Sequence, residues 1–409
     1  MNSLKVIISA YACEPGTGSE PGVGWNIVTQ MAKYHQVWVI TRANNRSKIE
    51  KEIPNNSISN PQFVYYDLPS WAMWWKKRAH GIQIYYYIWQ IGIFFIARKL
   101  HTEIAFDVAH HITFVKYSSP SLLSLLRIPF IWGPVGGGES TPKAFFKDLG
   151  FRGRLYEVMR ETARFIGKWD PLVRMTARNS KLSLATTAET AACLEWLGSK
   201  AVRNLGESGL SEPDCFRLSS LPQQVGATLR FISLGRLIHW KGFHLGLRAF
   251  AGAAIPDAEY WIVGDGPELT KLKGLVAQLK ISDRVYFLGA LPRSKGLEKL
   301  GECHVLVHPS LHDSGGWVCL EAMAAGRPVV CLNLGGPATQ VTTDTGFKIP
   351  AVTPKQVVAD MTKIMIRLAK DPALRERMGK AGRELVAREY SWDRKGEILS
   401  GYYAEVTGR

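Results

Sequence analysis

The stretch "HPSLHDSGGWVCLEAMAAGRPVV", residues 308–330, decides the fold of this chain. An apolar strand leads into a turn with Gly315 and Gly316, a short helix follows, and a glycine ends that helix before a second strand. In sheets built from such β-α-β units, ligands bind beyond the carboxyl ends of the strands. Asp313 and Glu321 flank the turn, so the stretch predicts a ligand held between two carboxylates at a helix N-terminus.

The turn before the helix is suited to an anion. We expect backbone amides there to point outward, where the helix dipole favours negative charge, and the two glycines to let a ligand approach closely. Glu321, one turn into the helix, could accept two ribose hydroxyls, while Asp313 would lie near a sugar. The alternatives are an exposed helix residue and a loop cap. The residues assigned to donor binding here are Ser314, Gly315, Gly316, Trp317 and Glu321.

Two further motifs follow strands in the second half of the chain. "SLGRLIHWKGF" places Arg236 and Lys241 five residues apart at a strand end. Such a pair can clamp a diphosphate, with arginine acting as a planar fork and lysine as a point charge. "VGDGPE" follows the next strand, and Gly264 suits a tight turn that could contact a base or ribose. The alternatives are solvated surface charges and an ordinary strand-to-helix turn.

Length and composition indicate two globular domains. The chain has 409 residues, of which 46% are hydrophobic and 21% charged, enough for two domains of roughly 200 residues. A formal charge of +16 indicates an anionic partner: nucleic acid, a phosphorylated ligand or an acidic membrane. The six cysteines form no C-x-x-C pair, which favours a reducing, cytosolic interior without disulfides or zinc. "LKVIISAYAC" is expected to be a first strand rather than a signal peptide.

Short apolar runs alternate with helical patterns in both halves, as in parallel sheets covered on both faces. We therefore predict the α/β class, with two Rossmann-like, doubly wound domains facing each other across a cleft. The domains are 1–205 and 230–390, a polar linker spans 206–229, and a C-terminal helix in 391–409 is expected to pack back on the N-terminal domain. The predicted strands are 4–10, 36–41, 62–68, 106–112, 128–133, 181–186, 230–235, 259–264, 284–289, 304–309 and 328–333.

The second half resembles the retaining, two-domain glycosyltransferases of family 4, which have the GT-B fold. That family carries G-R-…-K-G, then G-x-G-P, then a Pro-Ser turn with an acid, seven residues and a Glu in L-E-A-M-A-x-G-x-P-V-V. Here "GRLIHWKG", "GDGPE" and "PSLHDSGGWVCLEAMAAGRPVV" occur in that order and spacing. The resemblance implies a nucleotide-sugar-binding C-terminal domain and an acceptor-binding N-terminal domain. Asp313 departs from the usual Glu, and "SGGW" from the usual E-G-F-G.

The first half fits the family less tightly. "YACEPGTGSEPGVGWNIV", residues 11–28, resembles the family's Gly-rich loop, which implies that Gly22 and Gly24 lie near the donor phosphates. "DVAHHIT" resembles the segment whose histidine lies close to the transferred sugar and the acceptor. Side chains alternate along a strand, so only one of His110 and His111 can easily face the cleft. We favour His111, nearer the strand end; the alternative is a core histidine.

The resemblance implies retaining transfer of a sugar from a nucleotide-diphosphate donor to a glycan or lipid-linked acceptor, in polysaccharide or glycolipid biosynthesis. Charge that grows on the β-phosphate would be neutralised by Arg236, Lys241 and helix amides. No D-x-D motif stands at a strand end, so we expect no cofactor and no essential metal. The residues assigned to catalysis are Arg236, Lys241, His111, His110 and Asp313.

Two segments indicate contact with an anionic membrane, which would place the protein in the cytoplasm, peripheral on the inner face. "SWAMWWKKRAH", residues 70–80, sets tryptophans beside basic residues, and residues 151–181 form a basic, amphipathic stretch. The alternative is an ordinary helix that packs its tryptophans inward. Residues 81–97 are apolar but short of the roughly 20 that cross a bilayer, so we expect a helix buried against a sheet.

Other classes remain as alternatives. "GTGSEPG", residues 16–22, with Arg42 at a strand end, could indicate an NADP-dependent Rossmann oxidoreductase, but Pro15 and Pro21 lengthen and stiffen the loop. A non-catalytic nucleotide-sugar-binding protein is the second alternative, because Asp313 departs from the family pattern. Nucleic acid is not an expected partner, since the basic residues are dispersed and no nucleic-acid module is recognisable.

Overall fold

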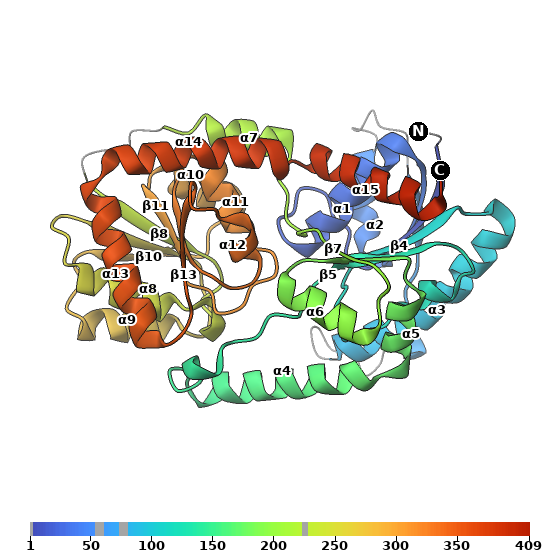
Figure 1. Ribbon diagram of the computed structural model, residues 1–409, viewed down its shortest axis with the longest axis horizontal. Coiled ribbons are helices and arrows are strands. Elements are labelled where there is room, and N and C mark those ends of the chain that lie inside the picture. The colour runs from blue at the N-terminus through green and yellow to red at the C-terminus, as the bar shows by residue number, and fades with distance from the viewer. Residues whose placement is uncertain (1–2, 54–60, 73–80, 223–227) are drawn as a thin grey trace. The chain divides into compact units, whose positions relative to one another are not determined.

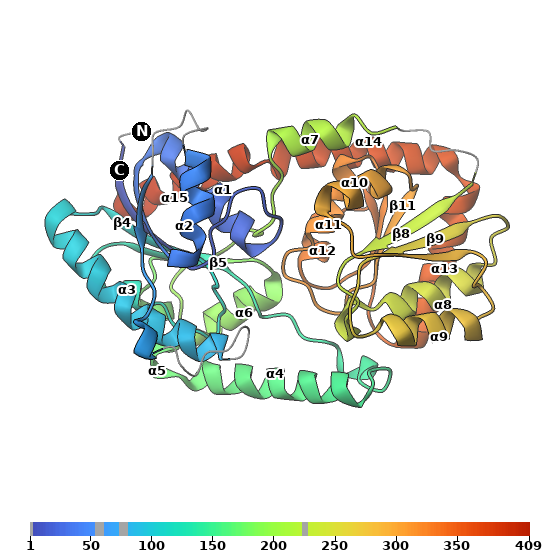
Figure 2. The ribbon, with the colours of Figure 1, turned by 180° about the vertical axis from the view of Figure 1, so that it is seen from behind.

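The computed structural model describes residues 3–53, 61–72, 81–222 and 228–409. Two compact units make up the chain, and each contains one parallel sheet with helices packed on it (Figures 1 and 2). Unit 1 comprises Met1–Gly138, Thr162–Glu207 and Trp392–Arg409, and unit 2 comprises Glu139–Glu161 and Ser208–Ser391.

The sheet of unit 1 has seven parallel strands in the order β3-β2-β1-β4-β5-β6-β7. Strands β2 and β3, which follow β1 in sequence, lie on one side of it in the sheet, and the strands that follow β4 lie on the other side of the β1–β4 pair. The junction of β1 and β4 is therefore the topological switch point, beside which loops diverge and a ligand can bind. The strands are β1 (Lys5–Ala10), β2 (Gln36–Thr41), β3 (Gln62–Tyr65), β4 (Val108–Thr113), β5 (Phe130–Val135), β6 (Leu182–Ala185) and β7 (Val202–Asn204).

Unit 2 repeats this plan with six parallel strands in the order β10-β9-β8-β11-β12-β13. Its switch point lies between β8 and β11, so the loops that follow these two strands are neighbours. Those loops carry Lys241 and Asp313. The strands are β8 (Arg230–Leu234), β9 (Glu259–Val263), β10 (Val285–Gly289), β11 (Val305–His308), β12 (Val329–Leu332) and β13 (Gly346–Ile349).

Helices cover both faces of the sheet in unit 2. Along β11, Val305 and Val307 join one apolar cluster while Leu306 between them joins another, as expected when successive side chains point to opposite faces. Burial on both faces explains why these strands are continuous apolar runs rather than alternating ones. The helices of unit 2 are α7 (Glu212–Ser219), α8 (Phe243–Ala253), α9 (Leu269–Gln278), α10 (Arg293–Gly301), α11 (Trp317–Ala324), α12 (Gly335–Gln340), α13 (Pro354–Lys370) and α14 (Pro372–Glu389).

Helix α4 (Phe151–Trp169) begins in unit 2 and ends in unit 1. Helix α3 buries one side, including Trp89, and leaves Ile84 and Phe95 exposed, so the buried helix expected at 81–97 exists but is covered on one side only. None of the described helices is long and apolar enough to cross a membrane. The other helices of unit 1 are α1 (Glu20–Tyr34), α2 (Arg46–Glu52), α3 (Ile82–Ile104), α5 (Pro171–Asn179), α6 (Ala188–Leu197) and α15 (Trp392–Thr407).

The eleven predicted strands are all present, with ends shifted by up to three residues. Two observed strands, β7 and β13, were not predicted. Each lies at one edge of its sheet. Both are short, and β7 has a mostly exposed sequence, so neither shows the apolar run that marks a central strand. The predicted linker contains a helix, α7. All six cysteines are free.

The structure differs from the predicted domain 1–205 at residues 139–161, which group with unit 2. Phe145 and Leu149 are buried in the apolar core of unit 2, and Asp148 forms an ion pair with Arg248 at 3.0 Å. The predicted C-terminal helix is α15, which packs against α1 in unit 1, where the hydroxyl of Tyr403 contacts His110.

Replacement of Phe145 by alanine tests whether the core of unit 2 holds residues 139–161. The side chain is fully buried, so we expect Phe145→Ala to lower the free energy of unfolding by about 3–5 kcal/mol. Its neighbour Phe146 is only half-buried, and Phe146→Ala is expected to cost clearly less. Chemical denaturation of both variants measures the difference; equal losses would contradict this anchoring.

Candidate active site

The loops after β8 and β11 are bound to each other. Leu311 donates its backbone N–H to the carbonyl of Trp240 at 2.7 Å. Gly242 has a positive φ of 66°, and a Cβ there would lie 2.0 Å from the carbonyl oxygen of Pro309, so only glycine fits this approach. The contact fixes the short 3-10 turn His239–Lys241, and with it the base of the Lys241 side chain.

Lys241 and Asp313, both predicted site residues, form an ion pair across these loops. The Lys241 Nζ lies 2.5 Å from Asp313 Oδ2, and His308 Nε2 lies 3.1 Å from the same oxygen. Burial alone would raise the pKa of Asp313, but the Lys241 ammonium and the His308 hydrogen bond hold it well below its usual range. Asp313 is therefore an ionised carboxylate whose main partner is a cation.

The other oxygen of Asp313 supports the turn. Oδ1 accepts a hydrogen bond from the Gly316 N–H at 3.3 Å, and Gly316 caps helix α11 with a φ of 56°. This amide is turned toward Asp313, not outward as expected from the sequence. Ser314 and Gly315 lie in the turn, and Trp317 is the first residue of α11.

Helix α12 holds the same turn from its other side. A Cβ at Gly336 would lie 2.2 Å from the Ser314 carbonyl oxygen, and one at Gly335 would lie 2.4 Å from that of Asp313. Gly336 N–H also donates to the Asp313 carbonyl at 2.8 Å. This support was not predicted from the sequence, although the glycine pair that follows the last predicted strand was a visible signal.

Glu321 is a buried carboxylate on α11, which excludes the alternative of an exposed helix residue. Its Oε1 accepts hydrogen bonds from Arg293, at 2.9 Å from Nη2 and 3.0 Å from Nε, and Arg293 also pairs with Asp214 at 3.2 Å. Burial raises the pKa of Glu321, and the charge of Arg293 opposes that effect. Sequence reasoning did not single out Arg293 or Asp214, which lie outside the recognised motifs.

A hollow of about 290 Å³ brings three predicted residues together: Arg236, Gly264 and Glu321. Arg236 is exposed and has no ion-pair partner among the described residues, so its guanidinium is available to a ligand. Leucine and valine side chains on the walls suit a flat apolar group such as a base. The hollow is lined by Leu234, Gly235, Arg236, Val263, Gly264, Asp265, Ala290, Leu291, Arg293, Gly296, Leu297 and Glu321.

Gly264 is needed for the backbone itself. Its φ is 142°, and a Cβ would lie 1.9 Å from the carbonyl oxygen of Gly235. The loops after β8 and β9 can therefore approach each other only with glycine at this position. This packing explains the residue whether or not it touches a ligand.

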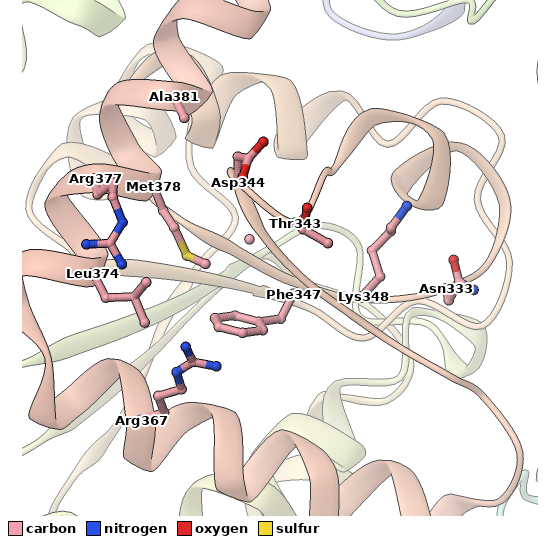
Figure 3. Close-up of a pocket in the computed structure, with 11 residues that line it drawn as sticks. Asn333, Thr343, Asp344, Phe347, Lys348, Arg367, Leu374, Arg377, Met378 and Ala381 are labelled. Carbon is pink, nitrogen blue, oxygen red and sulfur yellow. The ribbon is translucent and has the colours of Figure 1, made fainter.

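A larger hollow, of about 780 Å³, lies at the open edge of the same sheet (Figure 3). Phe347 of the edge strand β13 forms part of it, and the guanidinium of Arg367 lies 5.3 Å from the centre of that ring. Lys348 and Arg377 also line it and are exposed. None of the predicted site residues lies there, so we place the candidate site at the smaller hollow beside the switch point.

In unit 1, both candidate histidines of β4 are buried. His110 uses both ring nitrogens, with Nδ1 2.6 Å from the Tyr403 hydroxyl and Nε2 2.7 Å from the Gly133 carbonyl. His111 contacts the Tyr86 hydroxyl through Nε2 at 3.0 Å, and its Nδ1 has no hydrogen-bond partner among the described residues. Burial lowers the pKa of His110 to about 4 and that of His111 to about 3, so both rings are neutral. Of the two rings, only that of His111 has a nitrogen without a hydrogen-bond partner among the described residues, and this nitrogen is buried.

The glycines expected in a phosphate loop lie inside a helix. Gly22 and Gly24 are buried in the first turns of α1, where a Cβ would lie 2.0 Å from the Thr17 carbonyl oxygen and 2.1 Å from that of Ala12. They let the helix pack on the preceding loop; contact with donor phosphates stays a prediction. Arg42, the proposed 2′-phosphate partner of the NADP alternative, is held by Asp67 at 2.7 Å.

Comparison with known proteins covers the part of unit 2 that contains these residues. Residues 224–385 match the family model described as "Glycosyl transferases group 1". Residues 224–385 belong to the group 1 glycosyltransferases. The site residues from Arg236 to Glu321 all lie within this match, and the predicted resemblance is confirmed there.

Curated glycosyltransferases match part of the chain. A 2-deoxystreptamine glucosyltransferase of Streptomyces kanamyceticus is 32% identical over 191 residues, which are 46% of this chain and 48% of the relative. A GDP-mannose-dependent monoacylated alpha-(1-6)-phosphatidylinositol monomannoside mannosyltransferase of Corynebacterium glutamicum is 35% identical over 155 residues, 36% of this chain and 39% of the relative. The chain thus spans about half or less of the length of these relatives.

The fold is shared over the whole chain. Sucrose-phosphate synthase from Thermosynechococcus elongatus covers 99% of both chains with a TM-score of 0.65 and 18% identity. At that identity the likeness shows the fold alone. Together with the two parallel sheets, it confirms the predicted GT-B fold of two Rossmann-like units.

The ion pair of Arg293 and Glu321 predicts a pH-dependent loss of stability in Arg293→Met. Without its cation, the buried carboxylate has a further raised pKa, so its ionised form destabilises the folded state. At acidic pH the loss vanishes, because the folded and unfolded states both hold the proton. It grows as the pH rises through the folded pKa of Glu321 and reaches about 2 kcal/mol. This loss of unfolding free energy is set below that expected for a fully buried ion pair, because 34% of the Arg293 side chain is exposed.

Thermal unfolding over a range of pH measures this difference from the wild type. The matched control is Arg293→Met combined with Glu321→Gln, which lacks the buried carboxylate and should show a smaller pH dependence, because only Asp214 remains without its cation. An Arg293→Met deficit that stays constant with pH would contradict the assignment.

Proposed function

We propose that this chain is a retaining glycosyltransferase of the family 4 type that transfers a sugar from a nucleotide-diphosphate donor to a glycan or lipid-linked acceptor. The observation that carries the proposal is the Lys241–Asp313 pair in the loops after β8 and β11, together with a hollow lined by Arg236 and Glu321. Cations, an apolar-walled hollow and a buried carboxylate are the groups that a nucleoside diphosphate needs. The match of residues 224–385 to a glycosyltransferase family supports it.

Four side chains of unit 2 have a proposed role in donor binding. The base would occupy the hollow between Leu234 and Leu297, and Glu321 would accept the ribose hydroxyls. Arg236 and Lys241 would hold the diphosphate, the first as a fork and the second as a point charge. Asp313 would then lie near the sugar, and its ionised state keeps Lys241 in position.

The chemistry follows from where charge develops. As the bond between the anomeric carbon and the β-phosphate oxygen breaks, negative charge grows on that phosphate, and Arg236 and Lys241 neutralise it. The acceptor hydroxyl attacks from the same face as the departing phosphate, which takes the hydroxyl proton, so the anomeric configuration is retained. His111 in unit 1, neutral and with Nδ1 unbonded among the described residues, is the proposed contact to the sugar.

We propose that this transfer needs no cofactor and no metal. The phosphate charge has two cations to neutralise it, and Asp313 is already paired with Lys241. Among the residues that the structure describes, no group of three histidine, cysteine or acidic side chains could hold an ion.

An anionic membrane surface is the proposed place of work, with the protein peripheral on the cytoplasmic face in polysaccharide or glycolipid synthesis. The charge of +16 supports it, as does the mannosyltransferase relative whose name gives a phosphatidylinositol mannoside. In the predicted segment 70–80, Trp71 is strongly exposed, and residues 73–80 lie outside the described residues.

The first test is release of nucleoside diphosphate from a panel of UDP-, GDP- and ADP-sugars by the purified protein. We expect one donor to be consumed, and Arg236→Ala or Glu321→Gln to lose at least about a hundredfold in activity because each removes a donor contact. Arg388→Ala, on α14 with its side chain 67% exposed and outside the hollow, is the matched control and should keep full activity. Near wild-type turnover in both site variants would overturn the assignment; donor binding without turnover would favour the non-catalytic alternative.

A second test addresses the course of the reaction. With the consumed donor, NMR of the product should show the anomeric configuration of the donor sugar, and the rate should be unchanged by EDTA. Inversion of the configuration would contradict the proposed same-face attack. A rate that collapses in EDTA and returns with Mg²⁺ would contradict the metal-independent mechanism.

A further inference from the structure

Helix α4 packs its polar side on the protein. Two glycines mark that side: a Cβ at Gly153 would lie 3.1 Å from His239, and one at Gly167 would lie 2.5 Å from Ser118. Such close approach shows that this side of the helix is in contact along its length. The residues of this polar side recur at helical spacing and are Gly153, Glu157, Arg160, Arg164 and Gly167.

Charged groups on this side have partners within each unit. In unit 2, Glu157 Oε1 accepts hydrogen bonds from His239 Nε2 at 2.8 Å and His312 Nε2 at 3.2 Å. Burial opposes ionisation, yet these hydrogen bonds and the charge of Arg160 lower the pKa of Glu157 to about 2. In unit 1, Arg164 donates to the Tyr117 hydroxyl at 3.0 Å. The polar side is thus the structurally fixed one.

The opposite side of α4 is apolar and exposed. Six large side chains are each at least 49% exposed, and Trp169, 57% exposed, ends the same row. At 100° per residue these side chains occupy one face of the helix, opposite its polar side. We call this row the α4 stripe; it consists of Phe151, Leu155, Val158, Met159, Phe165 and Ile166.

This orientation is the reverse of that of an ordinary amphipathic helix, which buries its apolar face and solvates its polar one. An exposed apolar patch of this size marks contact with another molecule or a membrane. The apolar face of helix α4 is therefore available for contact with another molecule or a membrane.

Charge around the stripe identifies the occupant. Residues 143–181 contain ten lysines and arginines against four acids, and Arg152 and Arg178 are exposed. Trp169 stacks with the guanidinium of Arg174 at 4.6 Å, an aromatic and a cation side by side. A helix with an apolar face, a terminal tryptophan and flanking cations is suited to lie in the interface of an anionic bilayer.

We infer that the α4 stripe docks this protein on an anionic membrane, with the helix lying in the plane of the lipid headgroups. The inference rests on the proposed membrane association and names the surface that performs it. Through Glu157, the polar side of α4 contacts His239 and His312, which stand in the loops of Lys241 and Asp313. Docking would therefore hold the donor loops of unit 2 about one helix diameter, roughly 10 Å, from the lipid surface, within reach of a lipid-linked acceptor.

The test is co-sedimentation of the full chain with vesicles of phosphatidylcholine alone and of phosphatidylcholine mixed with phosphatidylglycerol. We expect wild-type protein to bind the mixed vesicles, and Phe165→Glu with Ile166→Glu to bind at least about tenfold more weakly. The matched control is Phe216→Glu with Val352→Glu, which removes two equally exposed apolar residues away from α4 and adds the same charge. This control should bind nearly as wild type.

Each outcome decides a separate point. If wild-type protein binds neither vesicle, the proposed membrane association fails as a whole. If it binds the mixed vesicles and the stripe variant binds equally, or if stripe and control variants lose equally, α4 is not the docking surface. A wild-type dimer that the stripe variant dissociates would instead assign the stripe to a second copy. Donor turnover in solution should be the same in all three proteins, which separates this test from that of the activity.

Discussion

The ion pair between Lys241 and Asp313 is the constraint on which the site depends. Their loops follow β8 and β11, which are adjacent at the switch point of the sheet in unit 2, so the topology alone brings the two residues together. A buried carboxylate needs a cation, and Asp313 has Lys241. In the proposed donor complex, Lys241 would turn to the phosphate while His308, 3.1 Å from Asp313 Oδ2, stays on the carboxylate. Under that proposal the pair keeps the cation in place for a phosphate.

The surroundings of the pair fix its two loops. The close backbone contact of Gly242 with Pro309 joins the two loops, and the close approach of Gly336 supports the turn after Asp313. Glu157 forms a hydrogen bond with one histidine in each loop. These contacts come from segments distant in sequence but converge on one edge of the sheet. The same helix that carries Glu157 bears the exposed stripe, so the proposed membrane contact and the donor loops share one support.

Much of this could be predicted from the sequence because the signals are local. Continuous apolar runs identified the central strands, and the spacing of Arg236, Lys241, Asp313 and Glu321 identified the loops. Edge strands such as β7 were missed because they lack that run. Partners such as Arg293 and Glu157 were missed because only the fold brings them to the site. The basic, amphipathic stretch 151–181 was predicted from the sequence to contact a membrane, but an amphipathic pattern does not say which side of α4 is packed.

The central claim is that Lys241 binds the β-phosphate of the donor. Calorimetric titration can test it by comparing nucleoside diphosphates with the matching monophosphates, UDP with UMP and GDP with GMP, in wild type and Lys241→Met. The account predicts that the wild type binds its preferred diphosphate at least about tenfold more tightly than the monophosphate, and that this ratio falls close to one in Lys241→Met. A ratio that persists unchanged in the variant would contradict it.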